Sequence, residues 1–236
     1  MEAIHLLSFG EGGWAAALLK AALVTLVLST LGFILGALLG GLAAAGQLSQ
    51  SRLLQHLAKG YCTVFRGVPD LLTIYLLYYG GSVLLTAAGQ SLGFEGFISL
   101  PIFATGVLAL GIISGAYQAE VYRGAYLAID SGQADASHAL GLSRRVTLRR
   151  IMIPQMLRIA LPGIANVWQL ILKDSALISV IGLVELMRQA QIAAGSTREP
   201  LMFYLAAGAL YLVIASTTGR LFQRAEKHAA RSVTAS

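Results

Sequence analysis

The chain has 236 residues, of which 56% are hydrophobic and only 12% are charged, and its mean hydropathy is +0.72. Soluble domains usually carry about 25% charged residues, and a bilayer requires apolar runs of about 20 residues, which this chain has. The composition therefore indicates an integral membrane protein and excludes a soluble globular one. The single cysteine, Cys62, excludes a disulfide framework within the chain, and the lack of a GxxxxGK[ST] loop excludes ATP hydrolysis by that route.

Hydropathy along the chain predicts five membrane spans. They lie at about 14–44, 60–88, 101–128, 157–184 and 200–222. We expect the first span to be retained, because the residues before it include Glu2 and Glu11 and lack the cationic region of a secretory signal. The fold class predicted is an all-α integral membrane protein with about five transmembrane helices, forming a single transmembrane domain over residues 1–236.

The distribution of lysine and arginine predicts the orientation of these spans. Basic residues gather in the 46–66 connection, in the long central loop and in the tail, whereas the 88–100 connection has none. Because cytoplasmic loops carry the excess of lysine and arginine, we expect the N-terminus outside and the C-terminus and central loop in the cytoplasm.

The first span contains a stripe of glycines on one helix face. Gly32, Gly36 and Gly40 recur at four-residue intervals, a spacing that lets a neighbouring helix approach closely. We interpret this stripe as a packing signal.

The second span holds a carboxylate, Asp70, which follows Pro69 in the early part of the span. An ionisable group in a bilayer costs at least ~2.5–3.5 kcal/mol on insertion scales, so it requires a partner or a function. Asp70 either attracts the cationic part of a substrate or, if the helix continues through Pro69, forms an ion pair with Arg66.

The third span places Tyr117 and Glu120 near one face of its helix, three residues apart. Glu120 could accept a guanidinium, imidazolium or ammonium group of a substrate. Arg123, three residues further on, could instead neutralise it.

Polar residues of the fourth span raise the same pair of alternatives. Asn166, Gln169 and Lys173 lie close to one helix face, and Asp174 is adjacent. Neighbouring residues on a helix point in different directions, so Lys173 and Asp174 need separate partners or an interrupted helix. For Asn166 and Gln169 the alternatives are hydrogen bonds between helices and ligand contact; Asp174 is a candidate for lining or gating a pathway.

The segment 130–156 between the third and fourth spans is compact and polar. A short helix over 134–140 would end at Gly141 in a left-handed cap, and Ser143 could cap a second helix that starts at Arg144, with Pro154 limiting the turn. The prediction is a helix–turn–helix at the cytoplasmic surface. Its arginines either bind anionic lipid headgroups or form a docking element for a cytoplasmic partner.

The spacing of Asp135-Ala136-Ser137, Gly141 and Ile153-Pro154 resembles the conserved "EAA…G" loop of ABC importer permeases. Two positions depart from that pattern, since aspartate replaces the usual glutamate and serine the second alanine. The stretches 65–80, 115–125, 161–186 and 196–200 are similar to polar amino acid importer permeases, above all those for histidine, lysine, arginine and ornithine and those for opines.

This resemblance implies the ABC type I importer permease fold in a bacterial inner membrane, with a periplasmic N-terminus. It implies as partners a homologous second permease subunit or a second copy of this chain, two ATP-binding cassette subunits, a periplasmic substrate-binding protein and membrane lipid, but no nucleic acid. It also implies that the chain is not an enzyme and holds no catalytic residue, metal or cofactor, since ATP is bound by the partner. The residues expected to couple to the ATPase are Asp135, Ala136, Ser137, Ala139, Leu140, Gly141 and Pro154.

Three functions remain open at this point. The first is an ATP-driven importer permease for basic or polar amino acids or opines, the second a self-contained secondary transporter or channel, and the third a scaffold that recruits a soluble protein. No internal repeat supports the second. The candidate residues of a substrate pathway are Asp70, Tyr117, Glu120, Asn166, Gln169 and Asp174.

Overall fold

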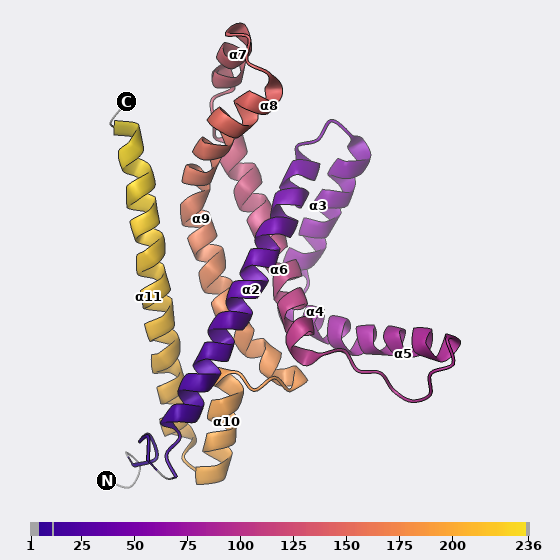
Figure 1. The fold of residues 1–236 in the computed structure, drawn as a ribbon, viewed down its shortest axis with the longest axis vertical. Helices are drawn as coiled ribbons and strands as arrows, with labels where there is room; N and C mark the ends of the chain where they lie inside the picture. Colours follow the sequence, from indigo (N-terminus) through magenta and orange to yellow (C-terminus); the bar gives the residue numbers. More distant parts are fainter. Residues whose placement is uncertain (1–4, 11, 235–236) are drawn as a thin grey trace.

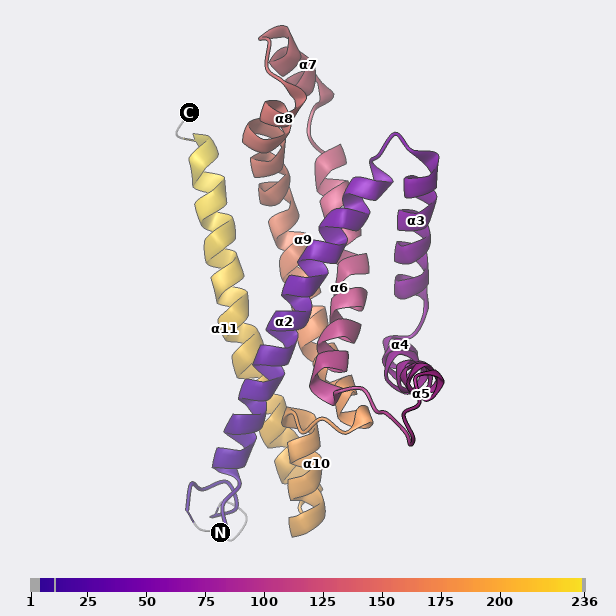
Figure 2. The same ribbon diagram turned by 45° about the vertical axis from the view of Figure 1, so that its right-hand side comes forward.

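A computed structural model describes residues 5–10 and 12–234 of the chain. The regular secondary structure of this part of the chain is all helical, and the helices form an elongated bundle (Figure 1). Four long helices run along the bundle: α2 (Ala15–Gln47), α6 (Ile102–Leu127), α9 (Ile153–Asp174) and α11 (Pro200–Thr234). The turned view shows α2 crossing in front of α6 and α9, with α11 along the left side of the bundle (Figure 2).

Five helical segments of the described chain are long and apolar enough to cross a membrane, as predicted. They are Ala15–Gln47, Asp70–Ser91, Ile102–Leu127, Arg144–Ile181 and Pro200–Ala229. The all-α fold class is therefore confirmed.

The glycine stripe packs α2 against α6. A Cβ atom on Gly36 would lie 2.5 Å from Ser114, and one on Gly40 would lie 2.8 Å from the carbonyl oxygen of Gly115. Gly41, on another face of α2, would meet nothing within 4 Å. The stripe therefore allows an approach between the two backbones that a larger residue would prevent, which confirms the predicted packing role.

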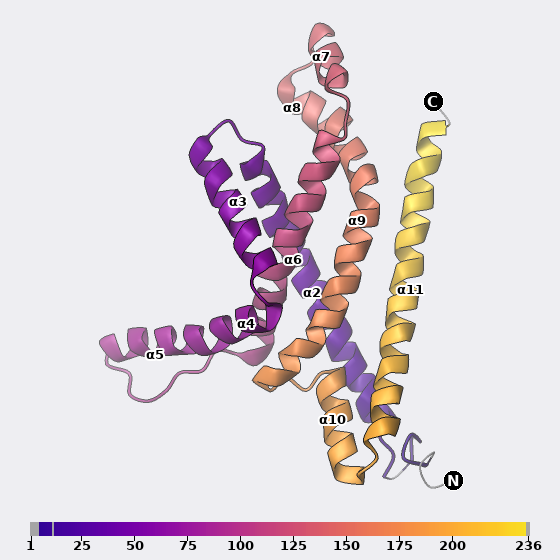
Figure 3. The same cartoon turned by 180° about the vertical axis from the view of Figure 1, so that it is seen from behind.

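The second expected span, 60–88, is wrong as a single helix. The chain forms α3 (Arg52–Gly67), a break at Val68 and Pro69, and then α4 (Asp70–Tyr75), η1 (Leu76–Gly80) and α5 (Gly81–Ser91). Val68 is extended, with φ −87° and ψ 137°, because a residue before proline avoids the helical region. The break lets α3 lie beside the end of α2 while α5 turns sideways out of the bundle (Figures 1 and 3).

The polar segment 130–156 is a helix–turn–helix, and its details differ from those expected. The first helix, α7 (Ser131–Ala139), starts earlier, because Asp130 caps it by accepting a 2.7 Å hydrogen bond from the Gly132 amide. Gly141 has the predicted left-handed conformation, with φ 75°. The second helix, α8 (Arg144–Thr147), starts at the expected residue, although the Ser143 side chain forms no capping hydrogen bond.

Pro154 does not end the second helix, contrary to the prediction. From α8 the chain passes through a π-helical turn, η2 (Leu148–Met152), directly into α9, where Pro154 lies within the first two positions. A proline inside a helix removes one backbone hydrogen bond, and the π-helical turn directly before Pro154 accommodates that interruption. The polar segment is thus joined to α9 by continuous helix.

Beyond α9 the helix narrows to a 3₁₀ helix, and the chain then reverses its direction. Asp174 is followed by the 3₁₀ helix η3 (Ser175–Ile181), and Gly182 has the left-handed φ of 102° that starts the turn to α10 (Leu186–Thr197). A core cluster that includes Leu18, Leu186 and Phe203 joins α2, α10 and α11 at this end of the bundle. The opposite end carries α7 and α8 (Figure 1).

Candidate functional site

Two carboxylates that are distant in the sequence come together at helix ends. Asp70 is the first residue of α4, directly after the break, and Asp174 is the last residue of α9, directly before η3. Their carboxyl groups contact each other, and both side chains are partly buried. The broken second span and the tightened end of α9 therefore place two acidic groups in one location.

No lysine or arginine among the described residues forms an ion pair with Asp70 or Asp174. Within the same part of the chain, Asp174 Oδ2 is buried and receives no hydrogen bond. Adjacent carboxylates repel each other, and a buried acceptor without a donor costs free energy. The pair is therefore an acidic location that has no ion-paired lysine or arginine among the described residues.

Arg66 does not pair with Asp70, which was one of the two alternatives for that carboxylate. Its guanidinium lies 3.9 Å from Glu120 and 5.7 Å from the centre of the Tyr117 ring. Tyr117 is close enough to both Asp70 and Asp174 to interact with them electrostatically. Tyr117 and Arg66 thus border the acidic pair on the side of Glu120.

Glu120 has cationic and polar partners within the protein. Arg123 Nη2 donates to it at 2.8 Å, Gln47 Nε2 donates at 3.0 Å, and Arg66 is the more distant third partner. The predicted neutralisation by Arg123 is confirmed. A direct contact between Glu120 and a substrate stays a prediction.

A polar cavity of about 530 Å³ adjoins these residues between the end of α2, α3 and α6. Its lining includes Lys59, Arg66, Glu120 and Arg123. Cys62 also lines it, and burial raises the pKa of this thiol, which accepts a 3.1 Å hydrogen bond from Gln47. The thiol therefore stays neutral, and the charge of the cavity comes from its lysine, arginine and glutamate side chains.

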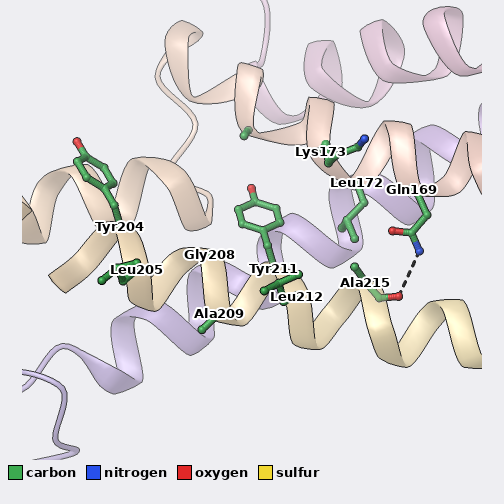
Figure 4. A pocket seen from close by; sticks show the side chains of 11 residues that line it. Gln169, Leu172, Lys173, Tyr204, Leu205, Gly208, Ala209, Tyr211, Leu212 and Ala215 are labelled. Atoms are coloured by element: carbon green, nitrogen blue, oxygen red, sulfur yellow. Dashed lines mark hydrogen bonds between the residues drawn. The ribbon is translucent and has the colours of Figure 1, made fainter. Parts of the chain in front are cut away.

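The structure does not bring Gln169 to the acidic pair. Gln169, on α9, donates a 3.2 Å hydrogen bond to the carbonyl oxygen of Ala215, on α11 (Figure 4). Of the two alternatives for Gln169, the hydrogen bond between helices is therefore the one observed. Lys173 and Gln169 line a mainly apolar cavity of about 840 Å³ between these helices. Asn166 is exposed and forms no side-chain hydrogen bond within the described chain. Lys173 and its neighbour Asp174 therefore serve different surfaces of α9.

Glu185 is a buried carboxylate that the sequence analysis did not single out. It is fully buried and accepts hydrogen bonds from the Met187 and Arg188 amides at 2.9 and 2.8 Å, from Tyr211 at 3.0 Å and from Thr25 at 3.3 Å. Burial raises its pKa, and these hydrogen bonds oppose that effect. Glu185 caps α10 and ties it to α2 and α11; its place three residues after a turn glycine and before an apolar helix was the available signal.

The candidate coupling residues lie on and around α7, at the tip of the molecule (Figure 1). Asp135, Ala136, Ala139 and Leu140 are exposed, and Leu140 has 79% of its surface exposed. Ser137 instead points inward and donates to the Gln133 carbonyl oxygen at 2.7 Å. Gly141 is exposed at the turn, and the partly buried Pro154 lies further along, within α9. The tip thus combines an exposed apolar side chain with polar neighbours.

Comparison with known proteins defines the class to which this fold and site belong. Residues 32–229 match the model of the family described as "Binding-protein-dependent transport system inner membrane component". The octopine transport system permease protein OccQ of Rhizobium radiobacter is 48% identical over 99% of this chain and 98% of its own. The histidine/lysine/arginine/ornithine transport system permease protein HisQ of Escherichia coli is 41% identical over 87% of this chain and 90% of its own.

A solved structure agrees with these matches. The crystal structure of an amino acid ABC transporter with histidines has a chain 32% identical to this one, with a TM-score of 0.78 over 91% of this chain and 95% of that one. The chain therefore belongs to the family of binding-protein-dependent transport system inner membrane components. It is a multi-pass membrane permease of the ABC importer class, and the self-contained transporter or channel is no longer an alternative.

Proposed function

We propose that this chain imports amino acids or opines that carry a cationic group, such as histidine, lysine, arginine, ornithine or octopine. The observation behind the proposal is the Asp70–Asp174 pair, because two contacting carboxylates without a cation of their own attract a guanidinium or ammonium group. The octopine and histidine/lysine/arginine/ornithine systems of the relatives support the same substrate class.

In this proposal the chain is a single permease domain oriented with α7, α8 and the end of α11 in the cytoplasm. The excess of lysine and arginine around 144–158 and 220–231 supports this orientation. The start of α2 then lies on the periplasmic side, where a substrate-binding protein delivers its ligand.

The proposed partners supply the energy. Two ATP-binding cassette subunits bind and hydrolyse ATP, and a second permease subunit, homologous or identical, completes the pathway; the chain itself needs no cofactor. Leu140 and the exposed residues of α7 dock on the ATPase. Since α8, η2 and α9 form continuous helix that ends at Asp174, movement of the tip is transmitted to the acidic pair.

Uptake by the reconstituted complex tests the substrate class. With the cognate binding protein and ATP, Asp174→Asn is expected to lower uptake of L-arginine by about 10- to 100-fold, the loss of one charge-assisted contact of roughly 1.5–3 kcal/mol. Glu199→Gln, an exposed carboxylate between α10 and α11, is the matched control. Equal uptake by Asp174→Asn and the control contradicts the proposal.

Substrate-stimulated ATPase activity tests the coupling role. Gly141→Arg combines a large side chain with a left-handed residue that disfavours it, so the docking tip is distorted while the spans are left intact. The assembled mutant complex is expected to lose stimulation and uptake together. Coupling that persists in Gly141→Arg, or uptake without ATPase subunits, contradicts the proposed role.

A further inference from the structure

The polar cavity between α2, α3 and α6 has a charge opposite to that of the acidic pair. Three cationic side chains, Lys59, Arg66 and Arg123, line it together with one carboxylate, Glu120. Arg123 forms an ion pair with Glu120 at 2.8 Å, whereas Arg66 lies 3.9 Å from the same carboxylate. Lys59 forms no ion pair with a described residue. Two positive charges are therefore available to an anionic ligand.

The position of the cavity along the spans excludes an ordinary lipid-facing surface. Glu120 lies seven residues before the end of α6, which corresponds to about 10 Å at 1.5 Å per residue. Charged side chains at such a depth face protein or a water-filled cavity, since contact with lipid tails is costly. The exposed sides of Lys59 and Arg66 therefore face protein or water rather than lipid tails.

Arg66 stands between the two oppositely charged locations. It contacts Glu120 of the cavity and covers Tyr117, which in turn borders Asp70 and Asp174. Tyr117 lies three residues from Glu120 on α6, on the side away from the proposed cytoplasmic end. A molecule that moves from the acidic pair toward the tip of the bundle must therefore pass Arg66 and then meet the basic cavity.

We propose that the cavity lined by Lys59, Arg66, Arg123 and Glu120 is an exit subsite that binds the carboxylate of the amino acid as it leaves toward the cytoplasm. The inference rests on the proposed function. Amino acids and opines carry a carboxylate whatever their side chain, so this subsite recognises the common head group, while the acidic pair recognises the side-chain cation. Lys59 and Arg66 bind the carboxylate, and Glu120 holds Arg123 in place.

Thiol labelling measures the charge of this cavity directly. Thr63 lines the cavity, is exposed and carries no charge, so Thr63→Cys in a Cys62→Ala background reports on it. The complete complex, without nucleotide, is placed in phosphatidylcholine nanodiscs, which contain no anionic lipid to fill the site. The probes are an anionic methanethiosulfonate (the ethylsulfonate) and a cationic one (the ethyltrimethylammonium), and labelling is read on this subunit.

The expected result is a preference for the anionic reagent of about tenfold over the reference Gln50→Cys, a residue on the exposed turn before α3. Lys59→Gln with Arg66→Gln should abolish this preference. Arg52→Gln, which removes a cation from the same helix outside the cavity, should leave it unchanged. An unchanged preference in the double variant, or no labelling of Thr63→Cys while Gln50→Cys reacts, overturns the proposal.

Protection from labelling identifies the ligand chemistry. L-arginine and L-alanine should each slow the labelling of Thr63→Cys, whereas agmatine, which is arginine without its carboxylate, should not. Protection by agmatine equal to that by arginine overturns the proposal, as does protection that survives in the double variant. The alanine measurement does not depend on a cationic side chain, so it separates failure of the exit subsite from failure of the proposed substrate class.

Discussion

Glu185 and the Asp70–Asp174 pair are two acidic regions of one chain. They differ in the number of hydrogen-bond donors that their carboxylates have within the protein. Glu185 accepts four hydrogen bonds from three helices and their connections. Asp174 Oδ2 is also buried and accepts none within the described residues. The first carboxylate is satisfied by the fold and holds it together; the second lacks such donors, and we propose that it serves a ligand. Burial of an acidic residue therefore does not by itself distinguish structure from function, but the set of hydrogen-bond donors does.

Glu185→Ala should have the largest effect on stability. It leaves four donors without their acceptor at the junction of α2, α10 and α11, for a loss of roughly 3 kcal/mol or more. Thermal unfolding and assembly of the purified complex measure this loss. Glu199→Ala, an exposed carboxylate nearby, should change neither; equal losses in the two variants would show that Glu185 does not hold this junction.

Gly40→Ala should destabilise the packing of α2 against α6. The added Cβ would lie 2.8 Å from the Gly115 carbonyl oxygen and 3.0 Å from the Ala119 amide, and backbone atoms cannot move aside easily. We expect a cost of about 1–3 kcal/mol in thermal stability. The neighbouring Gly41→Ala meets nothing within 4 Å and should stabilise by roughly 0.5–1 kcal/mol through helix propensity. Destabilisation by Gly41→Ala equal to that by Gly40→Ala would refute the close approach.

Asp174→Asn should change stability in the opposite direction to Glu185→Ala. Removing one of two contacting carboxylates relieves repulsion, so the melting temperature of the complex without substrate should rise by a few degrees. Added L-arginine should stabilise wild type more than this variant, because binding to the folded state raises apparent stability. A lower melting temperature in Asp174→Asn would indicate that its carboxylate is structural.

The pH dependence of Glu185 should give the smallest effect. Because burial raises its pKa, the folded state keeps a proton at pH values where the unfolded chain has released it. Its contribution to stability is thus greatest below the ordinary pKa of glutamate and decreases as pH rises through the raised pKa. Glu185→Gln should flatten the fall of the melting temperature with pH above the ordinary pKa of glutamate, and an unchanged slope would contradict the assignment.

The sequence predicts features that depend on local composition. Hydropathy located five spans, the Gly32–Gly40 spacing predicted a close approach of a neighbouring helix, and Gly141 predicted the turn after α7. The same signal could not show that α3 and α5 diverge, because hydropathy continues across Pro69 while the backbone turns there. It also could not show that a helix passes through Pro154, which depends on the π-helical turn before it.

The partners of charged residues were predictable only at short range. Arg123 lies one turn from Glu120, so their contact follows from helix geometry. Asp70 and Asp174 lie on different spans, and only the tertiary fold brings them together. The same reason explains why Glu185 was missed: two of its four donors, on Thr25 and Tyr211, come from other helices.

The most direct test of the acidic pair is binding of L-arginine and L-citrulline to the nucleotide-free complex without its binding protein. Citrulline has nearly the shape of arginine but a neutral urea group, so it separates charge recognition from fit. We predict that wild type binds arginine about 10- to 100-fold more tightly and that Asp70→Asn/Asp174→Asn binds the two about equally. Equal binding by wild type, or an arginine preference that survives in the double variant, would contradict a cation site at these carboxylates.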